Sequence, residues 1–225
     1  MTDRWATFDC YGTLIDWYGG IRGAVLRLWP AVDLERLLRR HQAMEPLVQE
    51  GRSLSYREVG ARTLRAMAAI EDLPLKEVDA YAFADSLPSW PAFQEVPAAL
   101  EQLRANGWKL AILSNTDPDL LAASREQIGV PFDLCITAKE AGSYKPAHGH
   151  WQRFFEDAAA DRTRHVHVGA SAFHDLAPAH ELGLRAVWIN RLNEVSAHPR
   201  AAELPDLRQL PTVLERLVPK ENVTT

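Results

Sequence analysis

Hydrophobic positions along the chain follow two different periods, and the change between them divides the sequence. Residues 4–9 form a short apolar stretch that ends on an acid, and Gly12 follows, which predicts a strand and then a turn. From about residue 18 to residue 90 the apolar positions recur almost only at helical spacing. Asp33 and Ser55 stand where two of these helices begin, and both residue types are good N-caps. The pattern therefore predicts a helical region directly after the first strand.

A third helix is expected after Leu75, and after Pro91 strands and helices alternate instead. Strands are expected at 109–113, 132–137, 165–168 and 185–189, and helices at 97–106, 118–128, 148–160, 175–182 and 211–217. Such alternation predicts a parallel sheet covered on both faces, with residues 192–206 as an irregular loop. We therefore expect an α/β fold: a Rossmann-like parallel-sheet core of residues 1–16 and 92–225, with an inserted all-helical cap of residues 17–91.

Length and charge narrow the class of protein. The 225 residues correspond to about 1.5 domains, which agrees with one core and one smaller insert. The net charge of -5 argues against a nucleic-acid partner, because such proteins normally carry a basic excess. No run of 18 apolar residues is present, so no membrane partner is expected. With only Cys10 and Cys135 and no signal-peptide pattern at the start, the expected location is cytoplasmic, with free thiols.

Polar residues follow each of the four expected central strands. In an open parallel sheet, ligands bind beyond the carboxyl ends of the strands, so these residues should share one edge. Any one of them also fits a turn or a helix cap. Taken together they favour a site, and they are Asp9, Tyr11, Thr13, Ser114, Asn115, Lys145, Ser171, His174 and Asp175.

These residues together could supply a nucleophile, a cation beside it and groups that bind an anionic substrate. Carboxylates serve as nucleophiles in covalent catalysis, which makes Asp9 a candidate. Lys145 is expected to keep Asp9 ionised, because an opposite charge within reach favours the charged form. Ser114, Asn115 and nearby backbone N–H groups are expected to bind an anionic part of a small-molecule substrate.

Four segments resemble the four motifs of the haloacid dehalogenase superfamily. They are Phe8-Asp9-Cys10-Tyr11-Gly12-Thr13-Leu14, Leu113-Ser114-Asn115, Lys145-Pro146 and the stretch from Gly169 to Asp175. Trp188-Ile189-Asn190-Arg191 is also similar to a strand end of the L-2-haloacid dehalogenase branch, called type II. The resemblance covers nearly the whole chain and implies an active site between core and cap. It leaves the oligomeric state open, with a homodimer as one option.

Most members of this superfamily are magnesium phosphatases, which carry two acids two residues apart in the first motif. Here Tyr11 occupies the second of these places. In the fourth motif Ala170 follows Gly169, where phosphatases usually carry an acid, and only Asp175 remains. Magnesium is therefore expected only under the phosphatase alternative.

The first motif is similar instead to that of metal-independent dehalogenases, which need no cofactor. By that resemblance Asp9 displaces halide from the α-carbon of a short 2-haloacid, and water then hydrolyses the resulting ester. Arg40 is the best match to the family's halide-binding arginine, with Arg39 as the alternative because the alignment there is loose. The substrate-binding residues that the resemblance implies are Tyr11, Arg40, Ser114, Asn115 and Trp151.

Two departures from the family pattern concern the hydrolytic half of the reaction. Ala170 and Ala172 stand where better-known dehalogenases carry Ser and Asn, and Trp151 stands where they carry Tyr. We expect His174 or Asp175 to orient or deprotonate the water instead, although His174 also fits a helix cap. The expected catalytic residues are thus Asp9, Thr13, Lys145, His174 and Asp175, and a non-catalytic relative is the remaining alternative.

Overall fold

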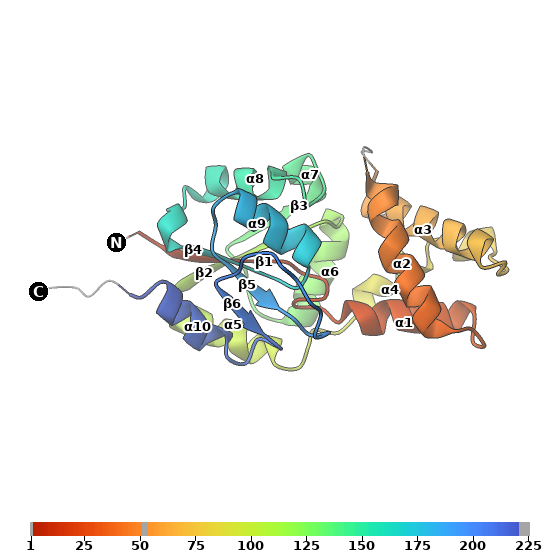
Figure 1. The fold of residues 1–225 in the computed structure, drawn as a ribbon, viewed down its shortest axis with the longest axis horizontal. Coiled ribbons are helices and arrows are strands. Elements are labelled where there is room, and N and C mark those ends of the chain that lie inside the picture. Colours follow the sequence, from red (N-terminus) through yellow and green to blue (C-terminus); the bar gives the residue numbers. More distant parts are fainter. Residues whose placement is uncertain (1, 51–53, 221–225) are drawn as a thin grey trace, which may run out of the picture.

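The computed structural model describes residues 2–50 and 54–220, and six parallel strands form its central sheet (Figure 1). The strand order is β3-β2-β1-β4-β5-β6. The strands are β1 (Arg4–Phe8), β2 (Trp108–Ser114), β3 (Leu134–Thr137), β4 (His165–Gly169), β5 (Ala186–Ile189) and β6 (Ala202–Leu204). The expected α/β fold with a parallel sheet is confirmed.

Helices cover both faces of this sheet (Figure 1). On one side lie α7 (Ala138–Ala141), α8 (Gly149–Ala158) and α9 (Ala177–Glu181), and on the other lie α5 (Val96–Ala105) and α10 (Leu210–Leu217). The remaining elements of this part are α6 (Pro118–Ile128), the short turn η3 (Arg162–Arg164) and the π-helical turn η4 (Ala172–Leu176). Helix α6 packs against the last turn of the helical segment described below.

The side chains of β1 alternate between the two faces, as the period of a strand requires. Trp5 packs edge-to-face on Phe154 of α8, with ring centroids 5.4 Å apart, whereas Ala6 and Phe8 belong to the core on the opposite face. Thr7 is fully buried, and its Oγ1 lies 2.9 Å from His165 Nε2 and 2.9 Å from His167 Nδ1. Both histidines thus face one side of the sheet, as their alternation in the sequence predicts.

Between β1 and α5 the described chain is helical, and we call this part the helical segment (residues 17–89). It comprises α1 (Trp17–Leu28), α2 (Leu34–Gln49), α3 (Tyr56–Ile70), η1 (Glu77–Asp79), α4 (Ala82–Ser86) and η2 (Leu87–Ser89). Both expected N-caps are confirmed, because the Asp33 side chain accepts from Arg36 N and the Ser55 side chain accepts from Glu58 N. Residues 51–53 of the expected cap, and residues 1 and 221–225 of the expected core, lie outside the described residues.

Two expectations need correction. The helix expected after Leu75 is three short pieces, η1, α4 and η2, and Pro88, which lacks a backbone donor, stands at the start of the last one. The loop expected at 192–206 contains β6, which is only three residues long and pairs with β5. Within residues 2–50 and 54–220, no helix is long and apolar enough to cross a membrane.

Candidate active site

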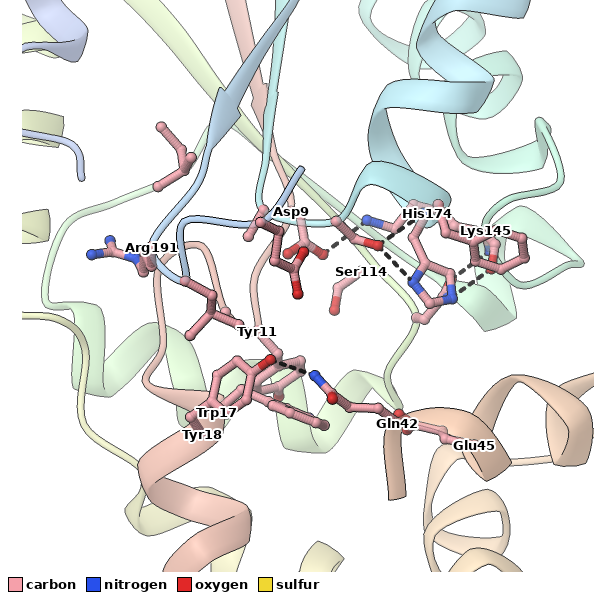
Figure 2. Close-up of a pocket in the computed structure, with 18 of the residues that line it drawn as sticks. Asp9, Tyr11, Trp17, Tyr18, Gln42, Glu45, Ser114, Lys145, His174 and Arg191 are labelled. Atoms are coloured by element: carbon pink, nitrogen blue, oxygen red, sulfur yellow. Dashed lines mark hydrogen bonds and ion pairs between the residues drawn. The ribbon is translucent and has the colours of Figure 1, made fainter. Parts of the chain in front are cut away.

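A cavity of about 700 Å³ lies between the carboxyl ends of the strands and the helical segment. Asp9, Ser114 and Lys145 line its sheet side, and Trp17, Tyr18, Gln42 and Glu45 line the side of the helical segment. Figure 2 shows Asp9 and Ser114 facing Trp17, Tyr18 and Gln42 across this space. The strand-end rule thus places the cavity at the edge of the sheet where the sequence predicts a site.

Asp9 and Asp175 share one lysine at the sheet side of the cavity. Lys145 Nζ lies 2.8 Å from Asp9 Oδ1 and 2.8 Å from Asp175 Oδ1. The side chain of Asp9 is 13% exposed and lines the cavity, whereas the side chains of Asp175 and Lys145 are only 0% and 1% exposed. Asp9 is therefore the carboxylate of this cluster that a substrate can reach.

The turn after β1 fixes the second oxygen of Asp9. Gly12 has φ of 88°, a left-handed conformation that suits glycine, and Thr13 follows it, fully buried. Thr13 Oγ1 donates a hydrogen bond of 2.8 Å to Asp9 Oδ2. With one oxygen held by Lys145 and the other by Thr13, the orientation of the Asp9 carboxylate is defined.

Asn115 holds the backbone of Lys145. Its Nδ2 donates to Lys145 O at 2.9 Å, and its Oδ1 accepts from Lys145 N at 2.6 Å. The amide thus bonds both backbone groups of the residue that carries the ammonium. Asn115 lines the cavity, but these contacts make it a positioning residue for Lys145.

The turn after β4 positions Asp175. Its Oδ2 accepts from Ser171 N at 3.0 Å, and its Oδ1 lies 3.3 Å from His167 Nε2. A Cβ on Gly169 would lie 2.4 Å from Asp175 Cγ, so only glycine leaves room for this carboxylate. Asp175 is enclosed on all sides and acts on Asp9 through Lys145.

Burial and neighbouring charges shift the pKa values of the three charged groups in this cluster differently. Burial raises the pKa of Asp9, and the neighbouring Asp175 adds to this while Lys145 opposes it. Burial acts against ionisation of Asp175 too, but Lys145 and His167 outweigh it and hold the pKa of Asp175 below its ordinary value. Burial favours the neutral form of Lys145, yet the two carboxylates outweigh this and raise its pKa. Lys145 therefore stays charged, and Asp175 is its permanent counter-ion.

His174 is one of the residues that line the cavity. Its Nδ1 lies 3.1 Å from Ser171 Oγ, and its Nε2 is buried with no hydrogen-bond partner among the described residues. Burial lowers the pKa of His174 to about 4, so the ring is neutral at neutral pH. The side chain that caps η4 is that of Ser171, which accepts from His174 N, so the alternative of His174 as a helix cap is wrong.

Ser114 and Tyr11 complete the sheet side. Ser114 lies at the end of β2, is 1% exposed, and its Oγ has no partner within the part of the chain that the structure describes. Tyr11 lines the cavity, and its hydroxyl lies 2.9 Å from Ser124 Oγ on α6. Its ring stacks parallel to Tyr56 of α3, at 6.3 Å between centroids. Ser114 thus offers an uncommitted hydroxyl beside Asp9, and Tyr11 links the sheet to the helical segment.

Comparison with known proteins places this geometry in a family. The model of the haloacid dehalogenase-like hydrolases matches residues 4–183, which include β1 to β4 and their carboxyl ends. The chain belongs to this family. The predicted superfamily and its L-2-haloacid dehalogenase branch are confirmed.

Individual relatives agree with the family match over nearly the full length. The (S)-2-haloacid dehalogenase 1 of Pseudomonas sp. (strain CBS-3) is 29% identical over 95% of this chain and 97% of its own. The solved structure of the L-2-haloacid dehalogenase RSc1362 has a TM-score of 0.84 at 25% identity, covering 96% of this chain and 100% of that one. A structure of the Xanthobacter autotrophicus enzyme with chloropropionic acid covalently bound matches in fold, with a TM-score of 0.83, 19% identity and coverage of 95% and 99%.

Two residues expected to bind substrate in this haloacid dehalogenase-like hydrolase lie elsewhere. Arg40 Nε contacts Glu71 Oε1 at 3.1 Å, and Arg40 is not among the described lining residues. On α2 it stands two residues before Gln42, so it points roughly 200° away from the face that Gln42 presents to the cavity. Arg39 is exposed and does not line the cavity either. Trp151 is fully buried against His167, with ring centroids 5.0 Å apart, and is a core residue.

Among residues 17–50 and 54–89, no arginine lines the cavity, and other residues stand there that sequence reasoning did not place in the site. Arg191 follows β5, and its Nη2 donates to Thr13 O at 2.9 Å and to Glu95 Oε1 at 2.7 Å. The strand-end rule applied to β5 would have found it. Glu45 of α2 lies among apolar residues in sequence, and only the phase of the helix brings it to the cavity.

Magnesium, which many superfamily members use, does not fit the acids present here. The Lys145 ammonium occupies the space between Asp9 and Asp175, and the Asp175 oxygens are already bonded and inaccessible. Throughout residues 2–50 and 54–220, no group of three or more His, Cys, Asp or Glu side chains is arranged to hold a metal ion. The acid that the phosphatases use two residues after the nucleophile is Tyr11 in this chain.

Proposed function

We propose that this protein is a metal-independent hydrolytic dehalogenase that acts on (S)-2-haloacids through an aspartyl ester on Asp9. The observation that carries the proposal is the Asp9 carboxylate, held by Lys145 and Thr13 at the wall of the cavity beyond the strand ends. The (S)-2-haloacid dehalogenases that match nearly the whole chain support it.

The first half of the reaction is a displacement at carbon. An Asp9 oxygen attacks C2 of the haloacid, the new C–O bond forms, and halide leaves with the electron pair of the C–halogen bond. The Lys145 ammonium, 2.8 Å from Asp9 Oδ1, opposes the effect of burial on the pKa of Asp9 and so favours the ionised form that attacks. The free hydroxyl of Ser114 donates to the substrate carboxylate, which fixes C2 against Asp9.

The second half is hydrolysis of the ester. Water adds to the Cγ atom of Asp9, the bond from Cγ to the ester oxygen breaks, and a 2-hydroxy acid leaves with inverted configuration at C2. One proton is released in this step. His174 Nε2, which is neutral and unpartnered at the cavity, is the group that orients the water and accepts this proton. Asp175 has no access to the water and serves as the counter-ion of Lys145.

The cap, residues 17–91 in this proposal, closes the site from the other side. Its residues Trp17, Tyr18 and Tyr56 line the cavity. A wall of this kind excludes water from the attacking carboxylate, which strengthens the electrostatic effect of Lys145. Free thiols at Cys10 and Cys135 support a cytoplasmic location, and the homodimer stays a prediction.

The test is halide release from (S)-2-chloropropionate in the presence of a chelator. The wild-type protein should release chloride with EDTA present, and Asp9→Asn should reduce the rate at least about a thousandfold, as expected for loss of a covalent nucleophile. A single turnover in oxygen-18 water should place the label in Asp9 and not in the product. Chloride release that survives Asp9→Asn would overturn the mechanism, and phosphate-ester turnover that requires added magnesium would favour a phosphatase.

Hydrolysis is tested separately with His174→Asn, whose amide can keep the contact with Ser171 but has no atom at the Nε2 position. We expect the ester to accumulate, detected by mass spectrometry as the substrate mass without halide on the peptide that contains Asp9. His148→Asn is the matched control, because His148 pairs with Glu181 on the surface. Normal turnover without ester accumulation in His174→Asn would assign water activation to another group.

A further inference from the structure

One face of α2 forms a polar wall of the cavity. Four residues of α2 occupy positions i, i+3, i+4 and i+7, which lie on the same side of a helix, and all four line the cavity: Gln42, Glu45, Pro46 and Gln49. Three of them carry hydrogen-bonding side chains. A wall meant only for the methyl group of a small haloacid would need none of these groups.

Glu45 is the unusual member of this wall. Its side chain is 15% exposed, and burial raises its pKa to about 7, while a hydrogen bond from the Tyr56 hydroxyl lowers it. Its neighbour His41 has Nδ1 3.9 Å from Glu45 Oε2, but burial lowers the pKa of His41 to about 4, so that ring is uncharged at neutral pH. Within the described residues Glu45 thus has no charged partner, although it borders the substrate cavity.

The size of the cavity leaves room for contact with this wall. A volume of about 700 Å³ lies in the range of roughly 300–1,000 Å³ that is typical of sites for drug-sized ligands. A haloacid with a carboxylate, a halogen and one methyl group fills a small part of it. The substituent at C2 can therefore be longer than a methyl group and extend from Asp9 toward α2.

We infer that Glu45 selects 2-haloacids whose C2 substituent ends in a hydrogen-bond donor, such as an amide or ammonium group, and that it rejects those ending in a second carboxylate. The inference rests on the proposed function for the chemistry at C2, and on the α2 wall for the recognition of the substituent. A buried carboxyl oxygen that meets an apolar group loses its hydrogen bond to water without replacement, whereas a donor satisfies it. Above pH 7, where Glu45 is mostly ionised, a second anion beside it meets a like charge.

Three acids of nearly equal shape test this selectivity. They are the (S) enantiomers of 2-chlorosuccinamate, with an amide donor, 2-chloro-4-methylpentanoate, with an apolar end, and 2-chlorosuccinate, with a second carboxylate. The wild-type protein should show a kcat/KM for 2-chlorosuccinamate at least about tenfold above that for the other two, which is the size of one charge-assisted hydrogen bond.

Variants of Glu45 separate recognition from folding. Glu45→Leu should remove the preference for 2-chlorosuccinamate and favour the apolar acid. Glu45→Gln, which keeps an acceptor oxygen, should retain activity on 2-chlorosuccinamate and gain activity on 2-chlorosuccinate. Glu35→Gln is the matched control on the same helix, since Glu35 is exposed, and it should behave as wild type. A wild-type preference below about threefold, or one that Glu45→Leu leaves unchanged, overturns the inference.

Binding of halogen-free acids distinguishes failure of the inference from failure of the proposed function. Succinamate and 4-methylpentanoate are titrated calorimetrically into wild type and Glu45→Leu, which needs no chemistry at C2. Tighter binding of succinamate that is lost in Glu45→Leu supports the role of Glu45 even if no acid releases chloride. Equal binding of the two acids overturns that role even if Asp9 forms an ester with all three chloroacids.

Discussion

The Lys145 ammonium determines the behaviour of the site at the scale of single residues. It is 1% exposed and lies within 2.8 Å of two carboxylates, and its backbone is fixed by Asn115. Sequence reasoning predicted that Lys145 would lie within reach of Asp9, and the two are 2.8 Å apart, whereas its role in keeping Asp9 ionised stays a prediction. It did not predict that Asn115 holds Lys145 or that Asp175 is inaccessible, because hydrogen-bond partners and burial depend on tertiary contacts that spacing does not encode.

Lys145→Met should destabilise the protein by about 3–5 kcal/mol, since it leaves two buried carboxylates without their cation. Without Lys145 the folded protein favours neutral Asp9 and Asp175, so their folded-state pKa values rise above the unfolded ones. The folded state then binds more protons than the unfolded state, and stability falls as pH increases. Urea unfolding at pH 5 and pH 8 measures this, with the larger loss expected at pH 8. An equal loss at both values would contradict the charge pairing.

At the scale of elements, the sequence predicted β1 to β5 and most helices. The predictions were wrong for the short strand β6 and for the residues that α2 turns toward the cavity. The strand β6 has three residues, too few for a period to be recognised. Two adjacent arginines on α2 matched the family's motif, but a shift of two residues along a helix changes the face by more than half a turn. The observed face carries Gln42 and Glu45, and Arg40 instead joins α2 to α3 through Glu71.

Arg40→Ala therefore tests a contact between α2 and the end of α3, and we expect little effect on catalysis. The side chain of Arg40 is 40% exposed, so loss of its ion pair should cost less than about 1 kcal/mol in the free energy of unfolding. Halide release should stay within about threefold of wild type, since Arg40 does not reach the cavity. Thermal unfolding and chloride kinetics on one preparation measure both effects. A hundredfold loss of kcat/KM with unchanged stability would instead support the halide-binding role.

At the scale of the whole molecule, the site lies where the sheet and the helical segment meet. Asp9, Ser114 and Lys145 come from the sheet, and Trp17, Gln42 and Glu45 come from the helical segment. A ligand in this cavity contacts both, so it binds the folded state alone. At a concentration of 100 times its Kd it should raise the free energy of unfolding by about 2.7 kcal/mol. Thermal unfolding with and without succinamate measures this, and two resolved transitions of which only one shifts would show that the parts unfold independently.

The placement of β1 has a consequence for the order in which the molecule is made. This strand is in the middle of the sheet, pairing Arg4 with Trp108 on one side and Trp5 with His165 on the other. During synthesis the strand that leads to Asp9 emerges before both of its neighbours, and these follow only after the helical segment. Contacts so distant in sequence form slowly, whereas the helices of residues 17–89 contact near neighbours. Asp9 is therefore synthesised well before Lys145, and the nascent chain lacks the proposed reactive pair until both residues have emerged and β1 has gained its neighbours.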